Sequence, residues 1–303
     1  MAGRDNWVAL QSTVETKVMQ KEQSGGILLG KQHMMFPRTY GLVSSETRTL
    51  PKNTAALEAL CQRYPGKVNV MLVPAASAIY PENVPAGAPL LDEDSYLDSL
   101  SDAVQAAGGR FVDVRQTLAD HKGEYIYYRT DHHWTTMGAQ AAYTLWAQAT
   151  GHTARSYELT LATDSFRGTL YSKVLLPDSV YDSVYYAPEI TVESVVCDGK
   201  DGALYDLSAL EQKDKYELFL GGNYGQCVIT TGTENGKHLL LVKDSFANSF
   251  VPFLTGDYET ITMIDLRYYR GSMAELAAEV DDILVLTEVT NLAGSGDYFK
   301  LSK

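Results

Sequence analysis

Short apolar runs alternate with amphipathic segments along most of this chain of 303 residues. Runs rich in Val, Leu and Ile and bounded by turn residues have the length of buried strands, and they lie at 68–74, 110–114, 238–242, 260–264 and 282–287. Apolar residues at helical spacing predict helices at 53–64, 91–107, 135–149 and 272–280, with Asn53 as the cap of the first. Strands that alternate with helices predict an α/β fold with a doubly wound, mostly parallel sheet.

Two parts of the chain depart from this alternation. Residues 6–24 are polar and helix-compatible, and glycines bound a short apolar run at 25–31 that is expected to form a buried strand. Residues 153–235 are rich in Tyr, Asp and Gly and contain only short β-like runs. We therefore expect a single α/β domain over 1–303, with 153–235 as a β-rich insertion over one end of the sheet.

Charge and hydropathy argue against binding to nucleic acid and against a membrane span. The formal net charge is −13, and no cluster of Lys and Arg is present, so binding to nucleic acid is not expected. No apolar run of about 18 residues occurs, so neither a membrane span nor a secretory signal is expected within these residues. The chain opens directly into a polar helical pattern, which is consistent with a trimmed start, so localisation is not readable from this end.

The cysteines give little indication of metal or redox chemistry. Cys61, Cys197 and Cys227 are widely spaced and form no Cys-x-x-Cys pair. Buried free thiols are the simplest interpretation. A disulfide between Cys197 and Cys227 is the alternative if the protein is exported.

The first candidate for chemistry lies at the end of the apolar strand 238–242. Ligands of open parallel sheets bind beyond the carboxyl ends of the strands, and Asp244 and Ser245 follow this strand directly and precede a predicted helix. Backbone N–H groups at such a helix start can stabilise an oxyanion beside a serine nucleophile. The alternative is that Asp244 or Ser245 only caps the helix.

The second candidate is the segment Thr-Asp-His-His-Trp at 130–134, directly before a predicted helix. A carboxylate beside an imidazole can fix its tautomer and leave the other ring nitrogen facing a nucleophile. Asp131, His132 and His133 also raise the alternative of a metal site. The remaining histidines form no His-x-x-x-His or His-x-His pattern that would complete one, so no metal and no cofactor are expected.

The third candidate combines two further strand ends. Gly271 and Asn291 follow the strands at 260–264 and 282–287, and their N–H and amide groups could complete an oxyanion hole with the N–H of Ser245. Arg267 in the same region is a candidate for binding an acidic substrate, although structural pairing with a carboxylate is the preferred interpretation. Taken singly, Gly271 and Asn291 are ordinary turn residues.

The order of these segments resembles that of SGNH hydrolases after circular permutation. That flavodoxin-like family places its nucleophile in a Gly-Asp-Ser turn, then a glycine, then an asparagine, and ends with an Asp-x-x-His loop that opens the last helix. Here the Asp-His half comes first, at 130–146, and the nucleophile half follows from Ser245. His133 lies five residues before Gly138, and this spacing resembles the family's and selects His133 over His132 as the base.

The same permuted order resembles the SGNH-like domains of alginate O-acetyltransferases. The segments DHHW, FRGTLYSK (166–173) and KDSFANSFVPFL (243–254) are similar to the bacterial DHHW family over nearly the whole chain. Two residues depart from the pattern of SGNH hydrolases: Lys243 replaces the glycine before Asp-Ser, and Asp131 lies two residues before the histidine instead of three. These departures bear on substrate approach and on the orientation of the imidazole.

The resemblance implies a Ser245–His133–Asp131 triad that transfers an acyl group, with an oxyanion hole from Ser245, Gly271 and Asn291. Candidates for substrate contact are Arg267, His132, Trp134 and Asn248. Tyrosines of the 153–235 segment could stack on sugar faces or pack that segment, namely Tyr171, Tyr181, Tyr185, Tyr186 and Tyr224.

The implied function is O-acetyl transfer to, or deacetylation of, a cell-surface or exported polysaccharide. A membrane-bound O-acyltransferase would donate the acyl group, and the protein would be extracellular or held in the cell envelope. The alternative is a non-catalytic polysaccharide-binding or assembly protein that retains the fold.

Overall fold

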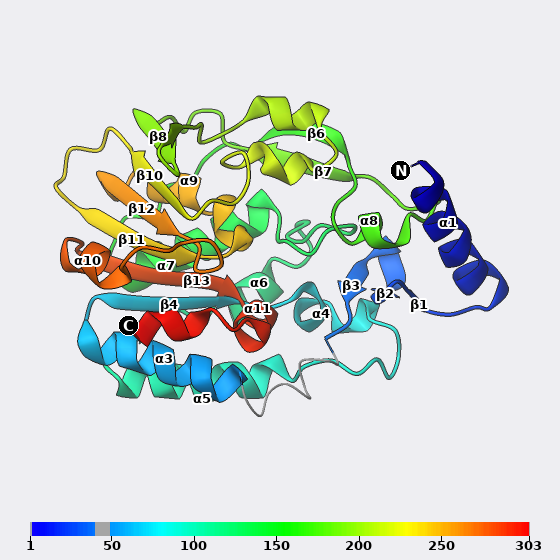
Figure 1. The fold of residues 1–303 in the computed structure, drawn as a ribbon, viewed down its shortest axis with the longest axis horizontal. Helices are drawn as coiled ribbons and strands as arrows, with labels where there is room; N and C mark the ends of the chain where they lie inside the picture. The colour runs from blue at the N-terminus through cyan, green and yellow to red at the C-terminus, as the bar shows by residue number, and fades with distance from the viewer. Residues whose placement is uncertain (1, 40–48, 303) are drawn as a thin grey trace.

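A computed structural model describes residues 2–39 and 49–302, and a twisted sheet of eight strands forms its centre (Figure 1). The strand order is β5-β4-β13-β11-β12-β10-β8-β9. The first five of these are mutually parallel: β5 (Arg110–Phe111), β4 (Val68–Val73), β13 (Asp282–Glu288), β11 (His238–Lys243) and β12 (Thr260–Ile264). The predicted α/β class with a mostly parallel sheet is therefore confirmed, although the expected strand at 110–114 pairs only over its first two residues.

The central strands are apolar throughout because helices cover both faces of the sheet. Leu239 and Leu241 of β11 belong to one buried cluster, whereas Leu240 and Val242 belong to the other. The second cluster packs against α3 (Thr49–Arg63), α5 (Glu93–Ala106), α10 (Met273–Ala278) and α11 (Val289–Gly294). The first packs against α6 (Arg115–Asp120), α7 (Thr136–Thr150) and α9 (Val251–Leu254).

Two predicted helices differ from the structure in detail. Asn53 does not cap α3, which begins at Thr49; its buried amide instead donates to Leu292 O (2.6 Å) and Ser295 O (2.8 Å) and so ties α3 to the end of α11. The apolar positions Met137, Ala141, Leu145 and Trp146 recur at helical spacing on α7, and of these Trp146 is buried while Met137 and Leu145 are partly buried. The buried face is centred on Ala139, Ala142, Tyr143, Trp146 and Ala147.

Strands from the 153–235 segment continue the sheet beyond β12. There β10 (Gln226–Thr230), β8 (Ser194–Cys197) and β9 (Lys200–Asp201) pair antiparallel in turn, and so extend the sheet itself. By contrast, β6 (Thr160–Phe166) and β7 (Asp182–Tyr186) form a separate hairpin. The division into one domain with an insertion at 153–235 stays a prediction.

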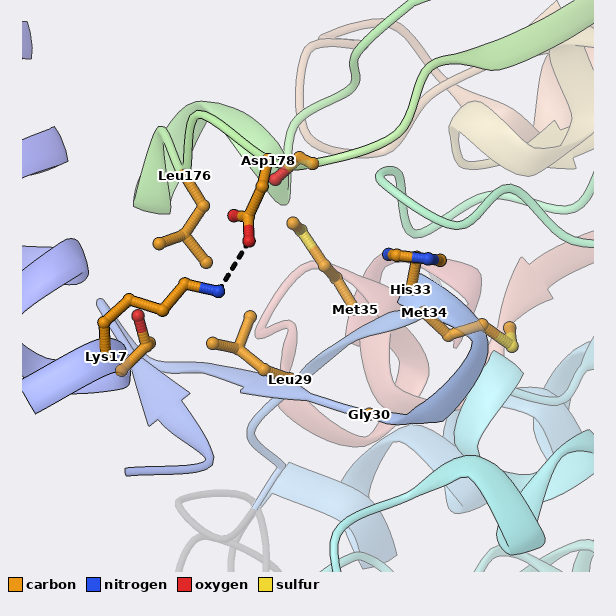
Figure 2. Close-up of a pocket in the computed structure, with 10 residues that line it drawn as sticks. Lys17, Leu29, Gly30, His33, Met34, Met35, Leu176 and Asp178 are labelled. Atoms are coloured by element: carbon orange, nitrogen blue, oxygen red, sulfur yellow. Dashed lines mark hydrogen bonds and ion pairs between the residues drawn. The ribbon is translucent and has the colours of Figure 1, made fainter. Parts of the chain in front are cut away.

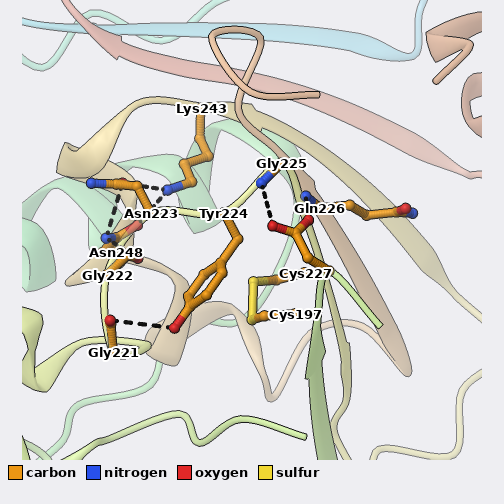
Figure 3. Close-up of a disulfide and its surroundings, with 11 residues drawn as sticks. Cys197, Gly221, Gly222, Asn223, Tyr224, Gly225, Gln226, Cys227, Lys243 and Asn248 are labelled. Atoms are coloured by element: carbon orange, nitrogen blue, oxygen red, sulfur yellow. Dashed lines mark hydrogen bonds between the residues drawn. A yellow bond between two sulfur atoms is a disulfide. The ribbon is translucent and has the colours of Figure 1, made fainter. Parts of the chain in front are cut away.

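A disulfide joins Cys197 and Cys227, which lie opposite each other on β8 and β10 (Figure 3). The interpretation of these two cysteines as free thiols is therefore wrong, because strand pairing brings together residues that lie 30 positions apart in sequence. Cys61 is buried and free, and burial raises the pKa of its thiol to about 11.

The N-terminal segment forms a small unit beside the main sheet (Figure 1). α1 (Ala2–Thr13) and a π-helical turn at Val14–Val18 lead into an antiparallel sheet of β1 (Gln23–Ser24), β2 (Ile27–Leu29) and β3 (Met35–Pro37). The strand expected at 25–31 is β2 of this small sheet.

An exposed Lys17–Asp178 ion pair (2.6 Å) crosses a cavity of about 170 Å³ between the N-terminal segment and the chain after α8 (Tyr171–Val174) (Figure 2). Such an exposed pair contributes little to stability.

The remaining helical elements are short. They are α4 (Ala76–Ile79) and the 3-10 turns Lys31–His33, Pro81–Asn83, Leu207–Glu211, Lys215–Leu218, Ser245–Asn248 and Tyr298–Ser302. Within 2–39 and 49–302, no helix has both the length and the apolar content needed to cross a bilayer.

Candidate active site

The two predicted chemical segments meet at the carboxyl end of β11. Ser245 opens the 3-10 turn that follows this strand, and Asp244 caps the turn by accepting a hydrogen bond from Phe246 N (2.9 Å). His133 lies on the loop before α7, whose cap is Thr135. Its Nε2 atom lies 2.7 Å from Ser245 Oγ, within the range that a nucleophile and its base require.

Asp131 completes a hydrogen-bonded chain with these two residues. Its Oδ1 lies 2.6 Å from His133 Nδ1 and also accepts a hydrogen bond from His133 N (3.0 Å). A separation of two residues therefore lets one carboxylate oxygen hold both the backbone and the ring of the histidine. The short Asp-x-His spacing is compatible with an oriented imidazole.

The charges of this cluster are set by its partners. Burial by itself would raise the pKa of Asp131, but the adjacent His132 and His133 rings and the hydrogen bonds to the carboxylate lower this pKa well below its usual range. Burial and the neighbouring His133 lower the pKa of His132 to about 4. At neutral pH the site therefore holds an ionised Asp131 beside a neutral His132.

Tyr216, in the turn Lys215–Leu218, holds the imidazole from a remote part of the chain. Its ring stacks on that of His133 with centroids 3.9 Å apart and an angle of 6°. Its hydroxyl donates to Ser245 O (2.9 Å), so the same side chain contacts both ends of the Ser–His pair. No local pattern distinguishes it from the other tyrosines of the 153–235 segment.

Thr169, within the FRGTLYSK segment, holds the carboxylate. Its N and Oγ1 atoms donate to Asp131 Oδ2 at 2.7 and 2.9 Å. Because that hydroxyl proton goes to Asp131, Thr169 Oγ1 accepts from His132 Nδ1, which lies 2.8 Å away. At Gly168 a Cβ atom would lie 2.3 Å from both Cβ and Oδ2 of Asp131, so only glycine allows this approach.

Asp182 of β7 fixes the start of the same loop. Its buried carboxylate accepts hydrogen bonds from Arg129 N (3.0 Å), Thr130 N (2.8 Å), Thr130 Oγ1 (2.6 Å) and the Tyr125 hydroxyl (2.6 Å). Sequence reasoning missed this residue, because an isolated Asp within a tyrosine-rich strand has no local signature.

Ser245 lies in a cavity of about 340 Å³. Its walls come from β3, the Asp-His loop and the carboxyl ends of β11, β12 and β13, and they comprise Pro37, Arg38, Thr39, His132, Asp244, Ser245, Phe246, Arg267, Glu288, Thr290 and Asn291.

Two of the candidate substrate residues, His132 and Arg267, line this cavity, and two do not. Trp134 is buried, and its Nε1 donates to Phe246 O (3.0 Å). Asn248 is also buried, with its amide directed to Gly222 O (3.2 Å). Both side chains pack beneath the Ser245 turn, and the predicted contact of Trp134 and Asn248 with substrate stays a prediction.

The predicted oxyanion hole is only partly assembled. Asn291 lines the cavity, but its Nδ2 donates to Asp244 Oδ2 (3.0 Å). Gly271 lines a separate cavity with Tyr269 and Arg270, so its part in the oxyanion hole stays a prediction. After β12 the chain turns at Asp265, and this turn brings Arg267 rather than Gly271 to the Ser245 cavity.

Arg267 is paired within its own turn. Its Nε and Nη2 atoms donate to Asp265 Oδ1 (2.9 Å) and Oδ2 (2.6 Å) in a forked arrangement. The structural pairing preferred from the sequence is thus present. None of the tyrosines proposed for sugar stacking lines the Ser245 cavity, and Tyr171 and Tyr181 instead contact the Arg167 guanidinium.

Lys243, which replaces the glycine of the SGNH pattern, does not line the cavity of Ser245. Its buried ammonium group donates to Asn223 Oδ1 and Asn248 Oδ1, both at 2.8 Å (Figure 3). Burial lowers the pKa of Lys243 to about 8. The substitution therefore links the Ser245 turn to the loop before Cys227 and leaves the approach to Ser245 open.

The metal alternative rests on Asp131, His132 and His133, whose donor atoms lie within 4.8 Å of one another. Protein partners already use these donors. His133 Nε2 faces Ser245, its Nδ1 faces Asp131, and His132 Nδ1 donates to Thr169. The arrangement therefore fits a hydrogen-bonded triad better than a set of metal ligands.

A Ser–His–Asp chain at the carboxyl end of a mostly parallel sheet is the arrangement of the SGNH-hydrolase-like class. The family model "SGNH hydrolase-like domain, acetyltransferase AlgX" matches residues 27–195, which is more than half of the chain. The chain therefore belongs to this AlgX-type family of SGNH hydrolase-like domains. No curated protein sequence gives a significant match.

Solved structures share this fold over nearly the whole chain. A DHHW family protein from Eubacterium siraeum DSM 15702 gives a TM-score of 0.70 at 22% identity, covering 92% of this chain and 95% of that one. Bacillus cereus PatB1 gives 0.68 at 18% identity, covering 91% and 99%. The O-acetyltransferase domain of Pseudomonas putida AlgJ gives 0.58 at 14% identity, covering 90% and 94%.

Proposed function

We propose that this protein is an SGNH-type O-acyltransferase that uses Ser245 as its nucleophile. Ser245 Oγ attacks the carbonyl carbon of an acyl donor while His133 Nε2 takes the hydroxyl proton, and Asp131 stabilises the imidazolium. The leaving group departs with that proton, and an acyl-serine remains. The single observation that carries the proposal is the 2.7 Å contact between Ser245 Oγ and His133 Nε2.

The second half-reaction restores the serine. An acceptor hydroxyl gives its proton to His133 and attacks the acyl carbon, and Ser245 leaves with the proton from His133. A sugar hydroxyl as acceptor makes the protein a transferase, and water makes it an esterase. Membership of an acetyltransferase family favours an acetyl group and the transferase.

The acceptor and the donor are proposed by resemblance to alginate O-acetyltransferases. We assign a cell-surface or exported polysaccharide as the acceptor and a membrane-bound O-acyltransferase as the source of acyl groups. The Cys197–Cys227 disulfide supports an extracellular or cell-envelope location, because disulfides persist in oxidising compartments.

Incubation with p-nitrophenyl acetate tests the nucleophile. The intact protein should release a burst of p-nitrophenol and become acetylated on Ser245, as mass spectrometry of the quenched protein would detect. Ser245→Ala should show only the background rate, whereas Ser99→Ala, on the exposed face of α5, should behave like the intact protein. Equal rates for all three proteins would favour the non-catalytic binding module.

The acceptor is tested by adding defined oligosaccharides to the same reaction. A transferase yields an acetylated sugar in proportion to p-nitrophenol, while an esterase yields free acetate. Elemental analysis of the purified protein addresses the metal alternative. Stoichiometric zinc or manganese that is lost in Asp131→Ala and His132→Ala would overturn the triad.

A further inference from the structure

A second buried carboxyl group lies in the wall of the Ser245 cavity. Glu288 ends β13, the strand that pairs with β11, and only 7% of its surface is exposed. Its Oε2 accepts a hydrogen bond from Thr290 Oγ1 (2.5 Å). Within the described part of the chain, no Lys, Arg or His forms an ion pair with this carboxyl group, which is unusual for a buried acid.

Glu288 feels the charge of another buried acid, Glu93 at the start of α5. Glu93 is 5% exposed, and its Oε2 accepts a hydrogen bond from Ala75 N (2.9 Å). Burial and the charge of Glu93 raise the pKa of Glu288 to about 8, whereas burial raises that of Glu93 to about 7. Hydrogen bonds from Thr290 and from the backbone of Asn291 lower the pKa of Glu288 but do not offset burial and the charge of Glu93, so the proton stays on Glu288.

Other charged groups around Glu288 do not take the proton away from it. Asp244, at the end of β11, adds a further negative charge. Across the cavity, the Arg267 guanidinium is engaged with Asp265, and His132 is neutral. Arg38 lines the same cavity but forms no ion pair with Glu288, and the neighbouring Tyr127 is neutral because burial raises its pKa.

Two of the three groups predicted for the oxyanion hole are engaged or placed elsewhere, and the N–H of Ser245 is the third. The Asn291 amide donates to Asp244, and Gly271 lies in a different cavity. A carboxylic acid that keeps its proton in an apolar site can donate a strong hydrogen bond to a substrate oxygen. Glu288 lies in the wall of the cavity that holds Ser245, where a bound substrate would reach it.

We propose that protonated Glu288 donates a hydrogen bond to an oxygen of the acyl substrate beside Ser245, and that Glu93 keeps Glu288 in this neutral form. This inference rests on the proposed function. Acyl transfer should then fail as Glu288 ionises, because the donor is lost and a negative charge faces the developing oxyanion. The other buried acid, Glu93, acts only through Glu288 and is a positioning residue.

The test is a pH profile of kcat/KM for p-nitrophenyl acetate, with the rate of Ser245→Ala subtracted at each pH. In the intact protein, kcat/KM should fall about tenfold per pH unit at alkaline pH, and this decline is the falling limb of the profile. Glu288→Gln keeps the shape and a donor but cannot ionise, so it should retain activity within about threefold at neutral pH and lose the falling limb. Glu93→Gln should move the limb to lower pH, since it removes the charge that holds the proton on Glu288.

Two further variants separate a substrate contact from a structural role. Glu288→Ala should lower kcat/KM by about tenfold or more at neutral pH, with an unchanged circular dichroism spectrum. Glu279→Gln, on an exposed glutamate, should match the intact protein at every pH.

An unchanged alkaline limb in Glu288→Gln, or full activity in Glu288→Ala, would overturn the inference while leaving the serine mechanism intact. A uniform loss at all pH values in folded Glu288→Gln would also overturn it, because the carboxyl group would then act as a base. Absence of any Ser245-dependent turnover in the intact protein would overturn the proposed function, and the inference with it.

Discussion

Two buried acids of the Ser245 site, Asp131 behind the His133 ring and Glu288 in the cavity wall, differ in charge state. Asp131 is 1% exposed and accepts hydrogen bonds from His133 N, His133 Nδ1, Thr169 N and Thr169 Oγ1. Its pKa is well below the usual range. Glu288 is almost as buried, but its hydrogen bonds from the Thr290 hydroxyl and the Asn291 backbone do not offset burial and the charge of Glu93, and its pKa is raised to about 8.

The contrast shows that partners rather than burial decide the charge of an acid in this site. Burial alone opposes ionisation of both groups. At Asp131, hydrogen-bond donors and imidazole rings outweigh burial, and they keep a carboxylate anion beside the ring of His133, where an imidazolium would form. At Glu288, the hydrogen bonds from Thr290 and Asn291 are too few to offset burial and the charge of Glu93, and a neutral acid results. Four substitutions would break or sharpen this contrast.

The largest effect is expected from Asp131→Asn. An amide cannot stabilise the imidazolium and favours the wrong tautomer of His133, so the Ser245-dependent kcat should fall by about 10³ to 10⁴-fold. Burst kinetics with p-nitrophenyl acetate would measure this loss. Asp102→Asn, on the exposed face of α5, is the control and should keep full activity. A loss below tenfold would mean that Asp131 is not the orienting acid.

Glu288, the neutral acid, should dominate the pH dependence of the free energy of unfolding. The ordinary pKa of Glu288 is 4.5 and its folded-state pKa is about 8, so above pH 4.5 the unfolded chain releases a proton that the folded protein keeps. Stability from this group is therefore complete below that pH and is lost as pH rises through about 8. Glu288→Gln should remove a decline of a few kcal/mol in the free energy of unfolding, measured by urea titration at pH 5, 7 and 9. A parallel decline in both proteins would show that Glu288 is ionised when folded.

Gly168→Ala should disturb the ionised Asp131 carboxylate through a steric clash alone. Its Cβ would lie 2.3 Å from Asp131 Oδ2, so the FRGT segment or the carboxylate must shift. We expect the free energy of unfolding to fall by about 1–3 kcal/mol, together with a loss of kcat. Gly123→Ala adds a Cβ with no atom within 4 Å and should leave both quantities unchanged.

Thr169→Val should have the smallest effect on the same carboxylate. It removes the hydroxyl that donates to Asp131 Oδ2 and accepts from His132, but it keeps the backbone hydrogen bond of 2.7 Å. The loss of one of several donors should cost about 1 kcal/mol, or five- to tenfold in kcat. Thr169→Ser should restore the rate, and failure of that rescue would assign the effect to packing instead.

The sequence by itself determined the main sheet and the central pair of the site. Strands β4, β11 and β12 match their predicted ranges closely because strands buried on both faces are apolar throughout, and this pattern is local. Ser245 and the Asp-His loop were identifiable because each directly follows a strand or precedes a helix. Their meeting at 2.7 Å follows from the common carboxyl edge of the sheet.

Only the tertiary structure decided which remote residues complete the site. Tyr216, Thr169 and Asp182 reach the Asp-His loop from the 153–235 segment, and Glu93 reaches Glu288 from α5. Each is an ordinary residue in its local context. Burial, hydrogen bonding and charge at these positions depend on contacts between distant segments, which a local periodicity does not encode.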